Sequence, residues 1–366
     1  MNIQEFIRPD IAQMEAYLPI LPFEVLSQRL GRDPQDIVKL DANENPYGPS
    51  PKALDALASG KYFHIYPDPE SNDLRDALST YTDTPKERLM AGMGADELID
   101  LVLRVMLSPG DVVVDCPPSF GMYPFSTAVN SGKYLQVWRN EDFSLDVEGI
   151  EQTVTEQNAK VLIICSPNNP NGSTIDDDTL RRLLKLPVLV LLDEAYADFA
   201  VYDGYRSHLD WVLEYDNLAV LRTFSKLAGL AGLRVGYGAF PEWLLPHMWK
   251  IKQPYNINVA ANLAALASLD DKEWLQEKMQ ALVAERQRMS QELAQISYLQ
   301  PYPTQSNFIL CRVLGCDAGQ LKRDLEQAGI LVRYFNKPGL DNCIRISAGR
   351  TEETDQLLAA LKSFEG

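Results

Sequence analysis

The sequence is poor in cysteine and histidine, and it has no long apolar run. Its 366 residues include three histidines and five cysteines, the latter at positions 116, 165, 311, 316 and 343. The cysteine number is odd and the spacing offers no set of metal ligands, so we expect buried, reduced thiols, no metal site and a cytoplasmic location. No apolar stretch approaches the roughly 20 residues that cross a bilayer. The first ten residues also lack the basic start and apolar core of a signal peptide.

Positive charge is in deficit as well. The chain has 34 Lys and Arg residues against 51 Asp and Glu residues, which gives a formal net charge of −17. This field would repel a phosphate backbone, so we do not expect nucleic acid as a partner. An anionic small molecule would need a local cluster of arginines that acts against the overall charge.

Apolar, strand-like runs alternate with helical patterns across roughly residues 85–240. Each run is followed by a polar loop rich in glycine or proline, and runs that are apolar throughout are typical of parallel strands buried on both faces. The clearest runs are residues 111–115, 133–137, 160–165, 188–192 and 218–221. The sequence therefore predicts an α/β fold with a mostly parallel sheet and helices on both faces.

The two ends of the chain differ from this centre. Residues 1–40 are typical of an arm with one short helix before Gly31, and residues 260–297 of a long helix with a candidate break at 269–271. The remainder is typical of a small α+β unit. Because 366 residues exceed one compact core, we expect three parts. They are an arm (1–40) that packs with the small domain, a large domain (41–258) and a small domain (259–366).

The stretch from Leu218 to Tyr237 carries the most chemical information. An apolar strand ends in Arg222, and Lys226 follows after two hydroxyl residues, with Arg234 eight positions later. An amine in this setting can form a Schiff base with an aldehyde, while Thr223, Ser225 and Arg234 can hold an anion. On this stretch alone, a surface lysine beside a glycine-rich loop explains the pattern equally well.

Other strand ends supply further polar side chains. Asn169 follows one buried strand, Asp193 ends the next, and Tyr196 comes three residues later. Such groups meet at the carboxyl edge of a parallel sheet. A glycine-rich helix start at Ala95 and Asp96 offers free backbone N–H groups to an anion.

These parts match the needs of pyridoxal 5′-phosphate. The aldehyde needs Lys226, and the pyridine nitrogen needs a buried carboxylate, Asp193. The phenolic oxygen needs donors, which Asn169 and Tyr196 can supply, and Phe120 can stack on the ring. The predicted phosphate site consists of Ala95, Asp96, Thr223, Ser225 and Arg234. For Phe120, a place in the core is an equally good explanation.

Nearly the whole chain resembles the fold-type I pyridoxal-phosphate-dependent aminotransferases, and within them the histidinol-phosphate aminotransferase subgroup. The resemblance is carried by N-E-N-P-Y-G (43–48), G-A-D-E-L-I (94–99), P-S-F-G-M-Y (118–123), S-P-N-N-P-N-G (166–172), D-E-A-Y-A-D-F (193–199), the stretch 222–236, S-N-F-I-L (306–310) and R-I-S-A-G (345–349). It implies a large domain with a seven-stranded sheet, a homodimer, and a reaction of L-histidinol phosphate with 2-oxoglutarate that gives imidazole acetol phosphate and L-glutamate in histidine biosynthesis.

The resemblance also implies roles for single residues. Lys226 would bind the cofactor aldehyde and act as the base, and Tyr66 would reach the cofactor phosphate of the neighbouring subunit. Arg345 would bind the substrate anion, with Arg333 as a second arm. Further candidates on the substrate side are Tyr17, Tyr255 and Asn45. For either arginine, a surface ion pair is the alternative.

Two departures and three rival functions remain. Asn171 stands where the family often has threonine, and Phe120 where tyrosine is also common; both replacements are compatible with cofactor binding. The rivals are a threonine-phosphate decarboxylase, an aromatic amino-acid aminotransferase and a non-catalytic cofactor-binding module. The sequence alone does not decide which substrate side chain fits.

Overall fold

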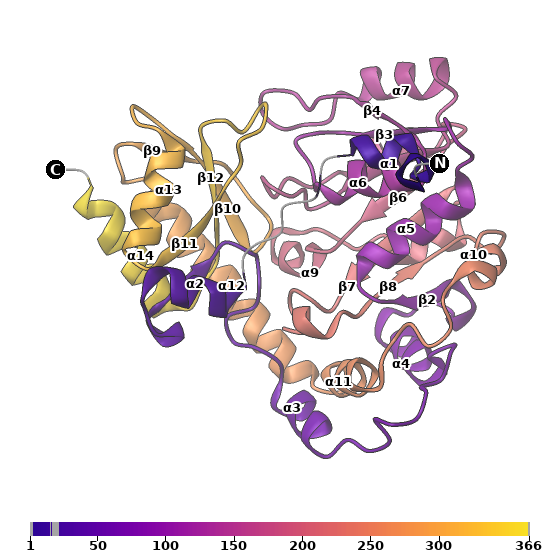
Figure 1. Cartoon of the computed structure of the whole chain (residues 1–366), viewed down its shortest axis with the longest axis horizontal. Helices are drawn as coiled ribbons and strands as arrows, with labels where there is room; N and C mark the ends of the chain where they lie inside the picture. Colours follow the sequence, from indigo (N-terminus) through magenta and orange to yellow (C-terminus); the bar gives the residue numbers. More distant parts are fainter. Residues whose placement is uncertain (1–2, 15, 17–21, 365–366) are drawn as a thin grey trace.

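The computed structural model of the chain describes residues 3–14, 16 and 22–364, and it contains two β-sheets that lie side by side (Figure 1). The larger sheet has seven strands and the smaller has five. The prediction of an α/β fold with a mostly parallel seven-stranded sheet and a smaller α+β unit is confirmed. In the part of the chain that is described, no helix combines the length and the apolar character needed to cross a membrane.

The large sheet supplies the edge on which the site is built. Its order is β2 (Leu89–Gly92), β8 (Gly236–Ala239), β7 (Leu218–Thr223), β6 (Leu189–Asp193), β5 (Val161–Cys165), β3 (Val112–Asp115) and β4 (Lys133–Gln136). Only β8 runs against the others. Strands β3, β5 and β6 are buried along their whole length, because helices cover both faces.

Side chains that alternate along these strands enter two separate cores. Leu189 and Leu191 belong to one core, and Val190 and Leu192 belong to the other. The first core is covered by α5 (Ala95–Met106), α6 (Met122–Val129) and α10 (Leu245–Ile251). The second is covered by α3 (Pro51–Ala58), α4 (Asn72–Thr82), α7 (Val147–Glu156), α8 (Asp177–Leu183), α9 (Ala197–Ala200) and α11 (Val259–Leu269).

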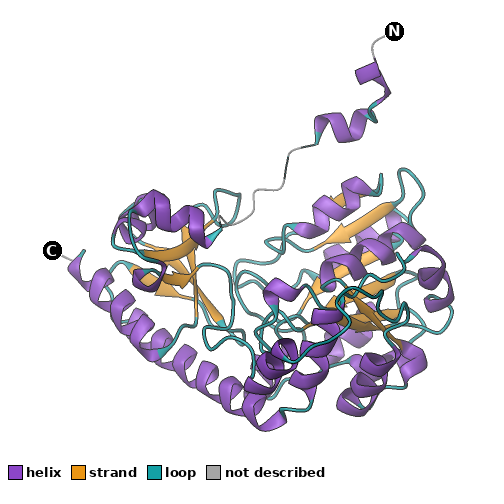
Figure 2. Ribbon diagram, turned by 60° about the horizontal axis from the view of Figure 1, so that its bottom comes forward, coloured by secondary structure: helices purple, strands orange, loops and turns teal. Residues whose placement is uncertain are grey.

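The small unit is built on a mixed five-stranded sheet. Its order is β1 (Val38–Leu40), β11 (Ile330–Tyr334), β12 (Cys343–Ser347), β10 (Phe308–Val313) and β9 (Leu299–Pro301). Its helices are α2 (Phe23–Leu30), α12 (Lys272–Leu293), α13 (Ala318–Gln327) and α14 (Thr351–Ser363). The predicted break in the long helix is confirmed, since α11 ends at Leu269 and α12 begins at Lys272. Figure 2 shows the helices on the outside of both sheets.

The N-terminal arm contacts the small unit, with which the sequence predicts that it packs, and it also contacts the large one. Strand β1 pairs in parallel with β11 of the small sheet. In contrast, α1 (Pro9–Gln13) lies against α6 of the large unit. Arg8, which precedes it, donates to the carbonyl of Val129 at 3.2 Å and to the hydroxyl of Ser131 at 2.7 Å. These contacts join the start of the arm to the large unit. The 3-10 helices are Ile3–Phe6, Pro34–Asp36, Lys86–Arg88, Val201–Asp203, Leu209–Leu213 and Ala231–Leu233.

Candidate active site

A cavity of about 360 Å³ lies where the carboxyl ends of β5, β6 and β7 meet the start of α5. Strand ends and a helix N-terminus at one edge of a parallel sheet form the usual ligand crevice of such folds. Ten of the eleven predicted cofactor residues line it: Ala95, Asp96, Phe120, Asn169, Asp193, Tyr196, Thr223, Ser225, Lys226 and Arg234. Residues that are up to 139 positions apart in the sequence therefore share one wall.

Lys226 lies in the loop directly after β7 and is half-buried. Its Nζ is 3.4 Å from the carbonyl oxygen of Ala42 and 5.4 Å from the centre of the Tyr196 ring. The amine is therefore held by one weak hydrogen bond and one aromatic face, and it points into the cavity that it lines. Such an amine can reach a carbonyl carbon without breaking a buried ion pair.

Asp193 is buried at the end of β6, and its two carboxylate oxygens accept separate hydrogen bonds. Tyr123 donates to Oδ2 at 2.8 Å, and the backbone N–H of Ala195 donates to Oδ1 at 3.0 Å. Burial raises the pKa of Asp193 to about 6, although both hydrogen bonds act in the opposite direction. A cation opposite this carboxylate would restore its charge. Sequence reasoning missed Tyr123, although it closes the motif P-S-F-G-M-Y three residues after Phe120.

The two predicted donors to a phenolic oxygen are oriented by other side chains. Asn43 donates to the hydroxyl of Tyr196 at 3.0 Å, so that this hydroxyl keeps its own proton to donate. Arg345 donates to Oδ1 of Asn169 at 2.6 Å, so the Nδ2 amide group of Asn169 is the part of this side chain that can donate to a ligand. Both Asn169 and Tyr196 can therefore act as donors inside the cavity. Asn43 is a second residue that sequence reasoning did not single out.

The predicted anion site combines a helix start with a cation and two hydroxyls. Gly94, with φ +78°, caps α5, so the N–H groups of the first turn point at the cavity. Arg234 pairs with Asp96 at 3.1 Å. The carboxylate of Asp96 would repel a phosphate, so its side chain can only orient the arginine, while its backbone N–H is the binding group. The hydroxyl of Thr223 accepts from the backbone N–H of Ser225 at 3.1 Å.

A second cavity of about 390 Å³ adjoins the first and shares Phe120, Asn169, Tyr196 and Lys226 with it. Arg333 and Arg345 both line this second cavity, since they are direct partners on the neighbouring strands β11 and β12. The carbon at the centre of each guanidinium lies 5.4 Å from the ring centre of Phe335. Two permanent cations beside an amine-bearing cavity can bind an anionic group of a substrate.

The other predicted residues lie elsewhere. Asn45 lines neither cavity, because its amide donates to the carbonyl of Leu227 at 2.6 Å and its oxygen accepts from the N–H of Tyr47. Tyr66 and Tyr255 stack on each other, with ring centres 4.6 Å apart, and line a separate surface hollow of the chain. Tyr17 lies outside the described residues. Among the described residues, no group of three or more His, Cys, Asp or Glu side chains could hold a metal ion.

The donor set fits pyridoxal 5′-phosphate. It offers one amine, one buried carboxylate whose pKa is raised, two side-chain donors, and an anion site of backbone N–H groups, hydroxyls and an arginine. The glycine at the start of α5 leaves room for the arginine of this set, since a Cβ at Gly94 would lie 2.7 Å from a guanidinium nitrogen of Arg234. Lys226, Asp193 and the amides at Ala95 and Asp96 would thus hold the cofactor.

Comparisons with known proteins agree with this geometry. The family described as aminotransferase class I and II matches residues 35–361. The chain is 53% identical over 360 residues to the chloroplastic histidinol-phosphate aminotransferase of Nicotiana plumbaginifolia, a match that covers 98% of this chain and 86% of the relative. It is 51% identical to the histidinol-phosphate aminotransferase of Roseiflexus castenholzii, with 99% and 98% covered.

A solved structure is also similar over the full length. The histidinol-phosphate aminotransferase of Sinorhizobium meliloti, crystallised in complex with pyridoxal 5′-phosphate, has a TM-score of 0.88 and 29% identity, with 98% of both chains covered. The chain therefore belongs to the class I and II aminotransferases and, within them, to the histidinol-phosphate aminotransferases.

Proposed function

We propose that the chain uses pyridoxal 5′-phosphate to transfer the amino group of L-histidinol phosphate to 2-oxoglutarate. The products are imidazole acetol phosphate and L-glutamate, as expected for a step of histidine biosynthesis. The observation that carries this proposal is the adjacency of the two cavities: an amine and a buried carboxylate line the first, and two arginines line the second. Relatives more than 50% identical bear the name of this activity.

The cofactor, when bound, would supply an aldehyde for covalent attachment and an electron sink for the substrate's Cα. Lys226 would be its attachment point and, once released, would take the proton from Cα. Asp193 would pair with the pyridine nitrogen, and its raised pKa supports this role, since a cation opposite would stabilise the charged form. Phe120 would stack on the ring.

The arginines would bind the substrate anions. Arg345 is 5% exposed and is held by Asn169, by the carbonyl of Asp41 at 2.8 Å and by the face of Phe308. A guanidinium fixed on these sides offers a planar fork that suits a carboxylate or a phosphate. Arg333 is less constrained and would add the second charge that a phosphate dianion requires.

A homodimer is part of the proposal. Tyr66 is 79% exposed and lies outside both cavities of its own chain, next to exposed Tyr62, Phe63 and Ile65. An exposed aromatic cluster of this kind is typical of an interface. In the dimer, the partner subunit's Tyr66 would reach the cofactor phosphate. Tyr255, which stacks on Tyr66, would enter the substrate side by the same route.

The division into an arm (1–40), a large domain (41–258) and a small domain (259–366) remains our prediction, as does a cytoplasmic location. The separation of the two sheets supports the domain boundaries. The free thiols of all five cysteines support a reducing compartment.

Substrate competition tests the reaction. Steady-state rates with histidinol phosphate and phenylalanine as amino donors should favour histidinol phosphate, because two arginines suit a phosphate dianion better than a single carboxylate. Threonine phosphate is tested alongside them, since it also carries a phosphate. A higher kcat/KM for phenylalanine would identify an aromatic aminotransferase. Release of carbon dioxide from threonine phosphate, without transfer of its amino group, would identify a decarboxylase.

Replacement of the amine tests the assigned lysine. Lys226→Ala should lower kcat by about 10⁴-fold or more, because the base and the attachment point are both lost. Mass spectrometry after borohydride reduction should find no cofactor on the variant chain. Lys362→Ala, which removes an exposed ion pair with Glu292, is the matched control and should leave both readouts unchanged. Near-normal turnover by Lys226→Ala would reject the assignment.

A further inference from the structure

A buried carboxylate that the proposed reaction does not use lies directly after Asp193. Glu194 has no exposed surface. One of its oxygens, Oε1, accepts from the hydroxyl of Tyr205 at 2.9 Å and from the backbone N–H of His208 at 2.9 Å, and lies 3.0 Å from Nδ1 of the His208 ring. The other oxygen accepts from the hydroxyl of Ser207. A carboxylate with this many donors is fixed in place.

Glu194 and Asp193 lie on opposite faces of the sheet. Leu191 and Asp193 share one face, where Tyr123 meets the Asp193 carboxylate. Leu192 and Glu194 share the other, where the His208 ring meets Trp211 edge-on at 4.6 Å. Strand alternation therefore places a cofactor-facing carboxylate and a core-facing carboxylate on consecutive residues.

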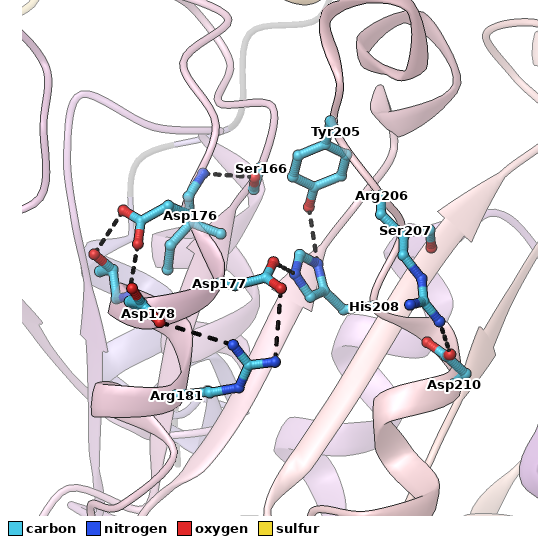
Figure 3. Close-up of polar contacts among 12 residues, drawn as sticks. Ser166, Asp176, Asp177, Asp178, Arg181, Tyr205, Arg206, Ser207, His208 and Asp210 are labelled. Atoms are coloured by element: carbon cyan, nitrogen blue, oxygen red, sulfur yellow. Dashed lines mark hydrogen bonds and ion pairs between the residues drawn. The ribbon is translucent and has the colours of Figure 1, made fainter.

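His208 extends the network to a neighbouring element. Its Nε2 lies 3.2 Å from Oδ1 of Asp177, the first residue of α8, as Figure 3 shows. Burial opposes protonation of His208, but its contacts with Glu194 and Asp177 outweigh burial and raise its pKa. The protonated ring satisfies both carboxylates at once. Arg181 lies beside the same Asp177, at 3.7 Å.

Arg222 ties the network to the next strand. It lies at the end of β7, one residue before Thr223, and its Nη1 is 3.6 Å from Oε2 of Glu194. Its other guanidinium nitrogen pairs with Asp198. Glu194 thus joins the ends of β6 and β7, which carry the pyridine-binding and phosphate-binding candidates. A shift of this carboxylate would displace both strand ends.

The turn that Glu194 begins holds the groups that face the cofactor. The N–H of Ala195 donates to the Asp193 carboxylate, the N–H of Ala197 donates to the carbonyl of Glu194 at 3.1 Å, and Tyr196 lies between them. We propose that Glu194, held by His208 and Arg222, is a positioning residue that sets the orientation of Asp193 and Tyr196 towards the cofactor. This inference rests on the proposed function only in that pyridoxal 5′-phosphate occupies the cavity.

If Glu194 has this role, its replacement should displace Asp193 and weaken the binding of the cofactor. In Glu194→Gln, an amide NH2 group replaces one carboxylate oxygen. In one orientation of the side chain it faces the backbone N–H of His208, and in the other it faces the guanidinium of Arg222, so two donors meet in either case. The turn must then shift to separate the two donors. We expect the affinity of the apoprotein for pyridoxal 5′-phosphate to fall about 10-fold or more, as is typical when an outer partner of a binding group is removed.

The experiment titrates apoprotein with pyridoxal 5′-phosphate and follows cofactor absorbance across pH. Glu194→Gln should raise the dissociation constant and move the pH midpoint of the bound-cofactor absorbance, because Asp193 no longer faces the ring nitrogen correctly. Melting temperatures with and without cofactor separate the two roles. A positioning role reduces the cofactor-induced rise, whereas a purely structural role lowers both temperatures equally.

Two further variants keep the test decisive. Tyr205→Phe removes a single donor to Glu194 and should produce a smaller shift in the same direction, even where Glu194→Gln folds poorly. Asp210→Asn breaks the neighbouring Arg206–Asp210 pair, which lies outside the network (Figure 3), and should bind the cofactor normally. Unchanged cofactor affinity and absorbance midpoint in both Glu194→Gln and Tyr205→Phe would overturn the proposal. Because the experiment measures cofactor binding, its outcome does not depend on which amino donor the enzyme uses.

Discussion

Among the individual side chains, Asp193 combines a cofactor-binding position with a cost to the stability of the empty protein. Its pKa is raised from 3.8 to about 6 because the carboxyl is buried. A carboxyl with a raised folded-state pKa contributes stability that is complete below its unfolded pKa and is lost as pH rises through the folded value. Two pKa units correspond to about 3 kcal/mol, so the contribution of Asp193 to the stability of the cofactor-free protein should fall between about pH 4 and pH 6.

Asp193→Asn should remove this pH dependence. The amide is neutral at all pH values, and the hydroxyl of Tyr123 can turn to accept from it. We expect the cofactor-free variant to exceed the cofactor-free wild type in free energy of unfolding by about 1–3 kcal/mol above pH 6, and to match it near pH 4. Urea unfolding across this range measures the difference. Asp178→Asn, at a 99% exposed side chain, should keep the wild-type slope; parallel curves for wild type and Asp193→Asn would contradict the account.

Phe335 brings a second residue-level property to the substrate side. Its ring lies 5.4 Å from both Arg333 and Arg345, and its quadrupole reduces the repulsion between two neighbouring cations. Arg345 has other supports, whereas this ring is the one aromatic contact found for Arg333 within the described residues. Phe335 is therefore expected to orient mainly the second arginine.

Phe335→Leu should raise the KM for histidinol phosphate about 3–10-fold with a smaller change in kcat, in line with one lost cation–π contact. The phosphate dianion requires both arginines, so its binding should suffer more than that of a monocarboxylate donor such as phenylalanine. Steady-state kinetics with both donors checks this. Phe335→Tyr, which keeps the ring, should restore the wild-type KM. A loss confined to kcat would show that the ring acts in another way.

The sequence predicts residues whose chemistry is rare and misses residues defined by contact. A lysine or an aspartate at a strand end is chemically conspicuous, so Lys226 and Asp193 could be identified without coordinates. Tyr123 and Asn43 act through side chains far away in the sequence, and nothing local marks them. Asn43 and Asn45 are alike in type and two positions apart, yet Asn43 donates to Tyr196 whereas Asn45 donates to the carbonyl of Leu227, a difference that residue type does not show.

Among the elements of the fold, the loop at residues 41–50 separates the lysine from the small sheet. Its backbone carbonyls accept from Lys226 and Arg345, and Asn43 bonds to Ser347 of β12 at 2.8 Å through its N–H. The loop can pack there because Gly229, with φ +68°, leaves no side chain in its path.

Gly229→Ala should therefore be strongly destabilising. A Cβ at this position would lie 2.3 Å from the carbonyl oxygen of Gly48, and the positive φ adds backbone strain. We expect a loss of at least about 2 kcal/mol in the free energy of unfolding, read from urea denaturation of the holoprotein. Gly232→Ala is the matched control for stability, since its Cβ meets no atom within 4 Å and its φ is not positive. Equal stability of the two variants would show that the loop can retreat without cost.

Strands β2 and β8 were not predicted, and glycine is the reason. Their sequences, L-M-A-G and G-Y-G-A, lack the β-branched residues that mark β3, β5, β6 and β7. A Cβ at Gly236 would lie 2.8 Å from the backbone nitrogen of Ala95, so this part of the sheet stays bare where the start of α5 crosses it. The glycines that make these strands hard to predict from sequence are thus the residues that allow the start of α5 to lie close to the sheet.

For the protein as an assembly, the proposed homodimer has a consequence that one chain cannot show. Tyr66 lies outside both cavities of its own chain, whereas Lys226 lines both. If the partner subunit's Tyr66 completes each site, every site needs Lys226 from one chain and Tyr66 from the other. Two variants defective in different chains could then complement each other.

A mixture of Lys226→Ala and Tyr66→Ala should recover activity that neither variant has. Random exchange in a two-fold dimer makes about half of the dimers hybrid, and each hybrid has one intact site of two, so about a quarter of wild-type activity is expected. Differently tagged chains, recovered on one tag, confirm that hybrids form. Lys226→Ala mixed with Asp193→Asn is the control: both residues line the same cavity of one chain, so that hybrid has no intact site and should stay at the level of its parents. If hybrids of the first pair form but remain inactive, Tyr66 does not act across the interface, because a partner subunit with an intact Tyr66 then fails to complete the site that contains Lys226.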